Sequence, residues 1–162
     1  MRKIIISLIL CSFFIISKIQ AEVAPSFSLP DLNGNYISLK SFWGKIVLIN
    51  FWATWCPVCR KEVIQLIRLK NKFKDNIEIL GISLDQNEKI LKHFVKYSNI
   101  NYKVLKGNLE VVKSYGNFRV IPISFLIDRS GNIRKIYKGF VEFENFSKDI
   151  KKLLFEGRLW KK

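Results

Sequence analysis

The chain has few of the side chains that most often bind metals: its 162 residues include three cysteines, one histidine and one methionine. A structural zinc site usually needs four Cys or His ligands. Cys56 and Cys59 form a close pair, and only Cys11 and His93 could join them, so the number of ligands argues against zinc. Copper would accept two thiolates, but the sequence has no methionine cluster to support such a site.

Acidic side chains are also scarce. Lys and Arg number 28 against 13 Asp and Glu, which gives a formal net charge of +15. A basic surface can indicate nucleic-acid binding, but the lysines are scattered along the chain and form no long basic block. We therefore expect no nucleic-acid partner, and a solvated basic surface that would attract anionic membranes or acidic partners.

No apolar run reaches the roughly 20 residues that a membrane-spanning helix requires. The N-terminus comes nearest, because Arg2 and Lys3 precede an apolar stretch at residues 4–16, and the small residue Ala21 stands before Glu22. A basic start, an apolar centre and a small residue before the cleavage point are typical of a secretory signal peptide.

This pattern divides the chain into two parts. Residues 1–21 are a signal peptide or an uncleaved N-terminal membrane anchor through residues 4–16, and residues 22–162 are a single domain. We expect export to the periplasm or to the outer face of the cytoplasmic membrane, where disulfides form. Cleavage would remove Cys11 and three basic residues but no acid, lowering the net charge from +15 to +12.

Two cysteines separated by two residues, Cys56 and Cys59, mark the candidate active site. An apolar run at residues 46–49 leads into them and a helical pattern at residues 57–73 leads out. A strand that delivers a Cys-x-x-Cys pair to the first turn of a helix is typical of a dithiol/disulfide redox site. A purely structural disulfide explains the pair less well, because closing so short a loop stabilises little.

Helix geometry gives the two cysteines different roles. Residues i and i+3 share one face of a helix, so Cys56 and Cys59 can form a disulfide. Cys56 lies at the helix start, where free N–H groups, the helix dipole and the nearby Arg60 and Lys61 favour the nucleophilic thiolate. Cys59 lies a turn deeper and would resolve the mixed disulfide.

Turn residues and apolar periodicity predict the remaining elements. Two short alternating segments around Asn33-Gly34, at residues 27–29 and 36–39, predict a β-hairpin. Further strands are expected at residues 46–52, 77–83, 123–127 and 133–137, and helices at 57–73, 86–97, 109–115 and 143–155. Strands that alternate with helices, followed by a late hairpin, predict an α/β fold with a central mixed β-sheet flanked by helices.

The segment around the cysteines, FWATWCPVC at residues 51–59, resembles the active site of the thioredoxin superfamily. Two further segments, FSLPDLNG at residues 27–34 and IPISFLID at residues 121–128, are similar to the exported TlpA/ResA type of thiol:disulfide oxidoreductase. The resemblance implies a thioredoxin-like fold with an N-terminal β-hairpin extension.

The resemblance also implies roles for individual residues. Cys56 would be the nucleophile and Cys59 the resolving thiol. Pro122 would be a cis-proline that faces the disulfide and aligns a substrate strand; the alternative is an ordinary trans-proline at a strand start. Trp55, together with Trp52, would shield the dithiol and offer a flat apolar surface to a partner.

Two acidic residues are candidates for assisting proton transfer. Thioredoxins carry a buried acid six residues before the first cysteine, and Asn50 stands there in this chain. Asp85 either takes part in a proton relay or caps the following helix, in a capping box with Glu88. Glu62, three residues after Cys59, either orients a proton or is a first-turn acid favoured by the helix dipole.

These features predict an exported, monomeric protein-disulfide reductase that needs no cofactor beyond its Cys56–Cys59 disulfide. The resemblance implies disulfide-bearing client proteins and a membrane thiol protein as electron donor, with cytochrome c maturation as one such role. Two alternatives stay open: an oxidase that introduces disulfides, and a metallochaperone that uses the same thiols without catalysis.

Overall fold

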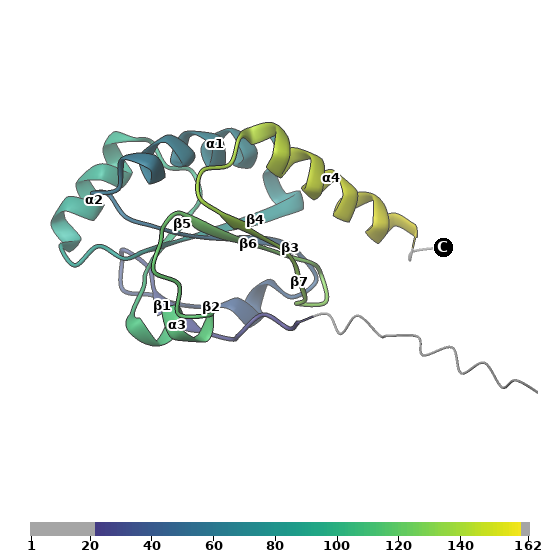
Figure 1. The fold of residues 1–162 in the computed structure, drawn as a ribbon, viewed down its shortest axis with the longest axis horizontal. Helices are drawn as coiled ribbons and strands as arrows, with labels where there is room; N and C mark the ends of the chain where they lie inside the picture. The colour runs from purple at the N-terminus through teal and green to yellow at the C-terminus, as the bar shows by residue number, and fades with distance from the viewer. Residues whose placement is uncertain (1–21, 160–162) are drawn as a thin grey trace, which may run out of the picture.

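A mixed five-stranded sheet in the order β5-β4-β3-β6-β7 forms the centre of the protein (Figure 1). The computed structural model describes residues 22–159, so the predicted signal peptide or anchor and Cys11 lie outside the described residues. β3 runs parallel to β4 and antiparallel to β6. The strands are β3 (Ile46–Trp52), β4 (Ile77–Ser83), β5 (Lys103–Lys106), β6 (Ile123–Ile127) and β7 (Ile133–Lys138).

Other elements cover both faces of the sheet, and each face has its own hydrophobic cluster. One face carries α1 (Pro57–Phe73), α2 (Glu88–Tyr97) and α4 (Phe143–Leu159), with a 3-10 turn at Lys74–Asn76 (Figure 1). The opposite face carries the hairpin of β1 (Ser28–Pro30) and β2 (Tyr36–Ser38), the 3-10 helix Leu39–Phe42, and α3 (Leu109–Ser114). This arrangement confirms the predicted fold class.

The central strand β3 is buried along its whole length. Side chains alternate between the two faces of a strand, so Leu48 packs in the cluster under α1 and Ile49 packs in the cluster on the hairpin side. A strand covered on both faces reads as a continuous apolar run, which is the pattern at its start. The strand ends at Trp52 and brings the chain directly to the first turn of α1.

The predicted N-terminal hairpin is present, with β1 and β2 paired antiparallel. The Asp31 carboxylate accepts the backbone N–H groups of Asn33 and Asn35, at 2.8 and 2.9 Å, and closes the turn between the two strands. Asn and Asp favour turns for this reason, because their side chains bond to the backbone two to four residues away.

Three elements differ from the sequence-based expectation, and one of them is α4, which ends at Leu159, four residues beyond the predicted end. The helix expected at residues 86–97 begins at Glu88, and its N-cap is Asn87, whose side chain accepts backbone N–H groups of the first turn. Asp85 therefore does not cap this helix, and the predicted capping box is wrong. The sequence pattern also misses β5, because a strand of four residues at the sheet edge is too short for a clear periodicity.

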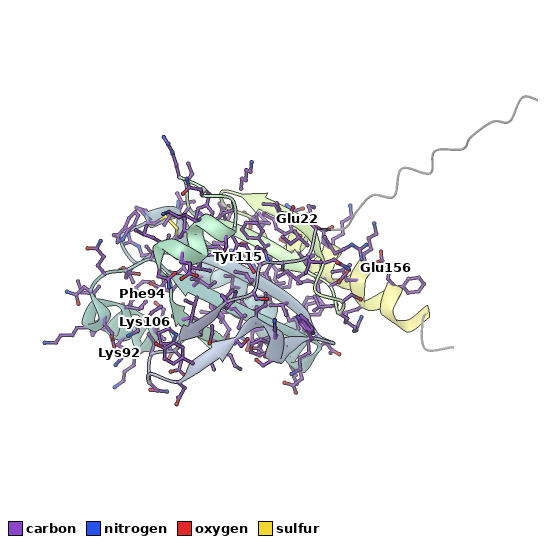
Figure 2. The ribbon with its side chains drawn as sticks, turned by 90° about the horizontal axis from the view of Figure 1, so that it is seen from below. Glu22, Lys92, Phe94, Lys106, Tyr115 and Glu156 are labelled. Atoms are coloured by element: carbon purple, nitrogen blue, oxygen red, sulfur yellow. A yellow bond between two sulfur atoms is a disulfide. The ribbon has the colours of Figure 1, made fainter. Side chains whose placement is uncertain are left out.

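Both ends of the described chain lie at the end of the sheet opposite the cysteines. The Ile133 N–H donates to the Glu22 carbonyl at 2.8 Å, and Arg129 donates to the Leu153 carbonyl at 3.3 Å. These contacts surround the β6–β7 turn beside the start of β3, and Figure 2 shows Glu22 and Glu156 together at that end. No helix among residues 22–159 is long and apolar enough to cross a membrane.

Candidate active site

Cys56 and Cys59 form a disulfide at the start of α1, drawn in yellow in Figure 2. Their Cα atoms are 5.2 Å apart, within the range that a disulfide requires. Cys56 is the N-cap of the helix, and Pro57 occupies the first helical position, where a missing N–H costs no hydrogen bond. The Cys59 N–H donates to Cys56 Sγ at 3.2 Å. The spacing of the two cysteines predicted this placement.

The Ile121–Pro122 peptide bond is cis, as the resemblance implied. The Ile121 carbonyl oxygen lies 3.8 Å from Cys56 Sγ, so the loop before β6 borders the disulfide. The Gly139 N–H donates to the Pro122 carbonyl at 2.9 Å and ties the end of β7 to the same loop. Pro122 and the cysteines therefore belong to one site, although they lie far apart in the sequence.

The two tryptophans near the cysteines have different surroundings. Trp55 is 65% exposed, next to Cys56, as expected for a residue that meets a partner. Trp52 is fully buried and packs against Phe94 of α2, with ring centroids 5.6 Å apart. The expectation that Trp52 offers an apolar surface to a partner is therefore wrong, because the last position of β3 belongs to the core.

Glu62 is the buried acid of the site. It lies in the second turn of α1 and is 1% exposed, so the explanation as a first-turn acid is wrong. Its Oε2 accepts the Asn50 side-chain amide at 2.7 Å, and its Oε1 accepts the Val141 backbone N–H at 2.9 Å. Burial raises the pKa of Glu62 to about 7, against the opposing effect of these two hydrogen bonds.

Asn50 connects Glu62 to Ser124 of the neighbouring strand, and sequence reasoning misses these contacts. Asn50 and Ser124 face each other on β3 and β6, and the Asn50 amide donates to Ser124 Oγ at 2.9 Å as well as to Glu62. Asn50 and Ser124 are each 1% exposed. A polar residue in each of two apolar strands was the available signal, since buried polar side chains need hydrogen-bond partners.

Asp85 holds the segment before the cysteines. Its carboxylate accepts the Thr54 N–H at 2.9 Å, the Thr54 hydroxyl, and the Ser83 hydroxyl at 2.7 Å. Arg60 donates to the Thr54 carbonyl at 3.2 Å. Thr54 is buried, and these contacts fix both its backbone and its side chain two residues before Cys56.

Metal-binding side chains do not cluster in the part of the chain that the structure describes: no three His, Cys, Asp or Glu residues are grouped there for a metal ion. His93 is exposed on α2 and stacks on Tyr97 with ring centroids 6.3 Å apart. At the described site, Cys56 and Cys59 are the groups whose chemistry suits a soft metal, and the disulfide occupies both.

The profile of the AhpC/TSA family matches residues 21–136, a stretch that includes both cysteines and the cis-proline. The chain belongs to the AhpC/TSA family. Among its relatives is a protein named "Thiol-disulfide oxidoreductase ResA" from Bacillus thuringiensis subsp. konkukian. The two are 38% identical over 133 residues, which cover 80% of this chain and 76% of that protein.

Solved structures of other proteins have the same architecture. A thiol:disulfide interchange protein of the thioredoxin family from Chlorobium tepidum TLS has a TM-score of 0.77 and 29% identity, covering 83% of this chain and 97% of that one. StoA from Bacillus subtilis has a TM-score of 0.67 and 26% identity, covering 78% and 96%. With the disulfide at the start of α1, these relatives establish this AhpC/TSA member as a thiol:disulfide oxidoreductase.

Proposed function

We propose that the protein is exported and reduces disulfide bonds in a limited set of client proteins. The placement of Cys56 carries the thiol-exchange part of this proposal: it caps α1, receives the Cys59 N–H, and is the more exposed cysteine of the pair, at 7% against 1%. Free N–H groups and the positive end of the helix dipole favour the thiolate, which is the species that attacks a disulfide.

The reaction would run in two exchanges. The Cys56 thiolate attacks one sulfur of the client disulfide, forming a Cys56–client disulfide and releasing the other client sulfur as a thiolate. The Cys59 thiolate then attacks Cys56 Sγ, so that the mixed disulfide breaks and the second client sulfur leaves. The client gains two electrons and two protons and ends as a dithiol, while the enzyme ends with its Cys56–Cys59 disulfide.

Glu62 is the residue that we assign to accept the proton of Cys59. It lies one turn beyond Cys59 on α1, and its pKa of about 7 leaves the carboxylate available at neutral pH. The Asn50 amide supports the carboxylate with a hydrogen bond. Asp85 suits this task less well, since Thr54 and Ser83 already donate to its carboxylate, and we assign it a positioning role.

Trp55 and Pro122 complete the proposed client site. The exposed ring of Trp55 offers an apolar surface beside Cys56. Pro122 follows the Ile121 carbonyl that borders the disulfide, so a client strand lying along this loop would bring its own disulfide to Cys56. Extended peptides commonly bind by adding to an exposed backbone edge in this way.

The proposed cycle needs no cofactor beyond the Cys56–Cys59 disulfide. A thiol protein of the membrane would reduce that disulfide by the same exchanges in reverse. The signal-like pattern of residues 1–21 supports export, and the similarity to a protein named "Thiol-disulfide oxidoreductase ResA" supports thiol:disulfide exchange, which we propose to run as reduction of the client. We propose a monomer that acts in cytochrome c maturation, with apocytochrome c as the first client to test.

Cysteine variants test the assignment of roles, in a Cys11→Ser background that removes the third thiol. Cys56→Ser should abolish insulin reduction, because the nucleophile is lost. Cys59→Ser should keep the first exchange and accumulate a Cys56–client disulfide, visible as a heavier band on a non-reducing gel. Retained turnover in the Cys56→Ser variant would contradict the assignment of the nucleophile.

The reduction potential of the Cys56–Cys59 couple decides the direction of electron flow. Measured against glutathione, a reductase should show a value at or below about −220 mV, toward the thioredoxin end of the scale. A value near about −120 mV would indicate an oxidase that donates disulfides, and the reductase proposal would fail.

A further inference from the structure

Four cationic side chains lie on segments that border the disulfide and form no ion pair within residues 22–159. They are Arg60, Lys61, Arg119 and Lys138, here named the basic rim, and all four are exposed. Arg60 makes one side-chain hydrogen bond, to the Thr54 carbonyl. The ion pairs of the described chain join other residues, so positive charge is left unmatched around the dithiol.

Two of the three segments that carry the basic rim meet at Cys56. The first turns of α1 carry Arg60 and Lys61, immediately after the disulfide. The loop before β6 carries Arg119 and contacts Cys56 Sγ through the Ile121 carbonyl oxygen, at 3.8 Å. The cations of helix and loop therefore border the sulfur that a client must reach.

The end of β7 carries the fourth member, Lys138, and reaches the same site. The Gly139 N–H donates to the Pro122 carbonyl at 2.9 Å, and the Val141 N–H donates to Glu62 at 2.9 Å. The segment from Lys138 onward thus passes the cis-proline and the buried acid in turn. Three separate elements supply the rim, so its charge is not the exposed face of a single helix.

Acidic groups near the basic rim balance only part of its charge. Glu62 is buried, and Asp85 is held by Thr54 and Ser83. Glu142 is the exposed acid on the segment that carries Lys138. Counting Asp85, Glu142 and the ionised form of Glu62 as three negative charges against the four cations still leaves a net charge of +1 on these segments.

Exposed apolar side chains lie on the same three segments as the basic rim. Their exposed fractions run from 38% to 70%, although large apolar side chains are normally buried. They are Trp55, Val58, Val120 and Phe140. A partner that covers this face would remove apolar surface from water and meet positive charge at the same time.

We propose that the basic rim selects client segments in which carboxylates flank the target disulfide beside an apolar residue. The inference rests on the proposed reductase function and names its substrate class. Opposite charge raises the encounter rate of a partner and suppresses partners of like charge. Because the rim is solvent-exposed, its effect acts mainly on association and is screened by salt.

Matched peptides test this selection. Each carries one intramolecular disulfide and one apolar residue, and the positions flanking the cysteines are Asp, Ser or Lys. The reduced full-length protein, in neutral detergent, is mixed with each peptide and the second-order rate constant is measured in a single turnover. We expect the rate constant to be highest for the Asp peptide, lower for the Ser peptide and lowest for the Lys peptide. At low salt, the rate constant of the Asp peptide should be about tenfold higher than that of the Lys peptide. The ratio should approach one at about 0.5 M salt.

Charge-reversal variants separate the basic rim from the net charge of the protein. Arg119→Glu with Lys138→Glu should abolish or reverse the Asp-to-Lys ratio, which is read within each variant. Lys151→Glu with Lys152→Glu makes the same change in net charge on the exposed side of α4. These residues precede Leu153, whose carbonyl accepts a hydrogen bond from Arg129 at the end of the sheet opposite the cysteines. This control should keep the ratio of the unmodified protein.

Each outcome has a separate meaning. Equal rate constants for the three peptides at low salt would overturn the selection while leaving the reductase function intact. An equal loss of the ratio in the rim variant and the α4 variant would assign the effect to overall charge and also overturn it. Failure to reduce any of the peptides would instead contradict the proposed function.

Discussion

Glu62, to which we assign the proton transfer, lies in a buried position that costs the fold stability when the carboxyl ionises. Burying an ionised carboxylate is unfavourable unless hydrogen-bond donors face it. Here the Asn50 amide and the Val141 N–H supply two donors, at 2.7 and 2.9 Å. They make the charged form tolerable, yet burial still raises the pKa to about 7. The same carboxyl is therefore suited to proton exchange and unfavourable for stability when ionised.

We predict that the free energy of unfolding falls as pH rises from about 4.5 to 7. The Glu62 carboxyl titrates near 4.5 in the unfolded chain and near 7 in the fold, so only the folded state holds this proton between those values. Stability therefore decreases with rising pH across this window, by about 3 kcal/mol in total. Urea unfolding of the oxidised protein at pH values from 4.5 to 8 measures the change.

Two glutamate variants control this measurement. Glu62→Gln cannot ionise and should show little pH dependence in the same window, although its absolute stability also changes. Glu88→Gln should keep the slope above about pH 5.5, because hydrogen bonds from Lys106 and Lys92 lower the pKa of Glu88 to about 2 and this carboxyl is then ionised in both the folded and the unfolded state. A slope that survives in Glu62→Gln would show that another group titrates on folding.

At the scale of elements, the start of α1 is held by the loop that follows β4. Asp85 accepts the Thr54 N–H and hydroxyl, and Ser83 in turn donates to Asp85. The segment between β3 and α1 is therefore fixed by a neighbour in the sheet as well as by its own helix. This explains how an exposed Trp55 can have a defined place beside a buried Thr54.

We expect Asp85→Ala to lower the free energy of unfolding by about 2 kcal/mol. The substitution removes a charged acceptor and leaves the buried Thr54 donors without a partner, and losses of this kind have that magnitude. Asp75→Ala is the matched control: Asp75 is exposed and makes no side-chain hydrogen bond or ion pair in the described structure, so its change should stay within about 0.5 kcal/mol. Urea denaturation compares the two; equal effects would mean that the Thr54 contacts contribute nothing.

Elements with strong local signals were predictable from the sequence. The residues predicted as 46–52, 57–73 and 77–83 form β3, α1 and β4 with the same bounds. The start of α2 was not predictable from its capping residues, because Asp85 and Asn87 both suit an N-cap. The Asp85 carboxylate accepts the N–H of Thr54, 31 positions away along the chain, and so does not cap α2.

In the site, too, features that depend on local contacts could be predicted from the sequence, and features that depend on distant contacts could not. The cysteine pair at the N-terminus of α1 follows from spacing and helix geometry alone. The burial of Glu62 does not, since a helical pattern does not reveal which segment covers a given face. Val141, which donates to Glu62, is 79 positions away, and only the packed fold brings them together.

For the whole molecule, the order of strands in the sheet predicts that local stability against opening falls from the central strand β3 to the edge strand β7. β3 has a neighbour on each side and a hydrophobic cluster on each face, whereas β7 is an edge strand with mostly exposed side chains. Local opening costs least where few buried contacts are lost. The most protected backbone is therefore expected in β3.

We predict that amide hydrogens of β3, such as those of Leu48 and Ile49, exchange only through global unfolding. Amides of β7 should exchange faster through local opening, because the edge of the sheet has no further strand to hold it. Hydrogen–deuterium exchange followed by mass spectrometry measures both in one sample. Protection in β7 equal to that in β3 would show that the sheet opens only as a unit.

The position of Glu22 has a consequence for how partners approach. Glu22 lies beside the start of β7, at the same end of the sheet as the start of β3. The seven residues of β3 carry the chain about 20 Å toward the opposite end before the cysteines begin. If residues 1–21 stay in the bilayer, the disulfide lies at the end of the domain that is farther from the point where the chain leaves the membrane. Soluble clients could then reach the disulfide from the aqueous phase. A donor in the same bilayer would need its thiols on a part that extends as far from the membrane surface as the disulfide does.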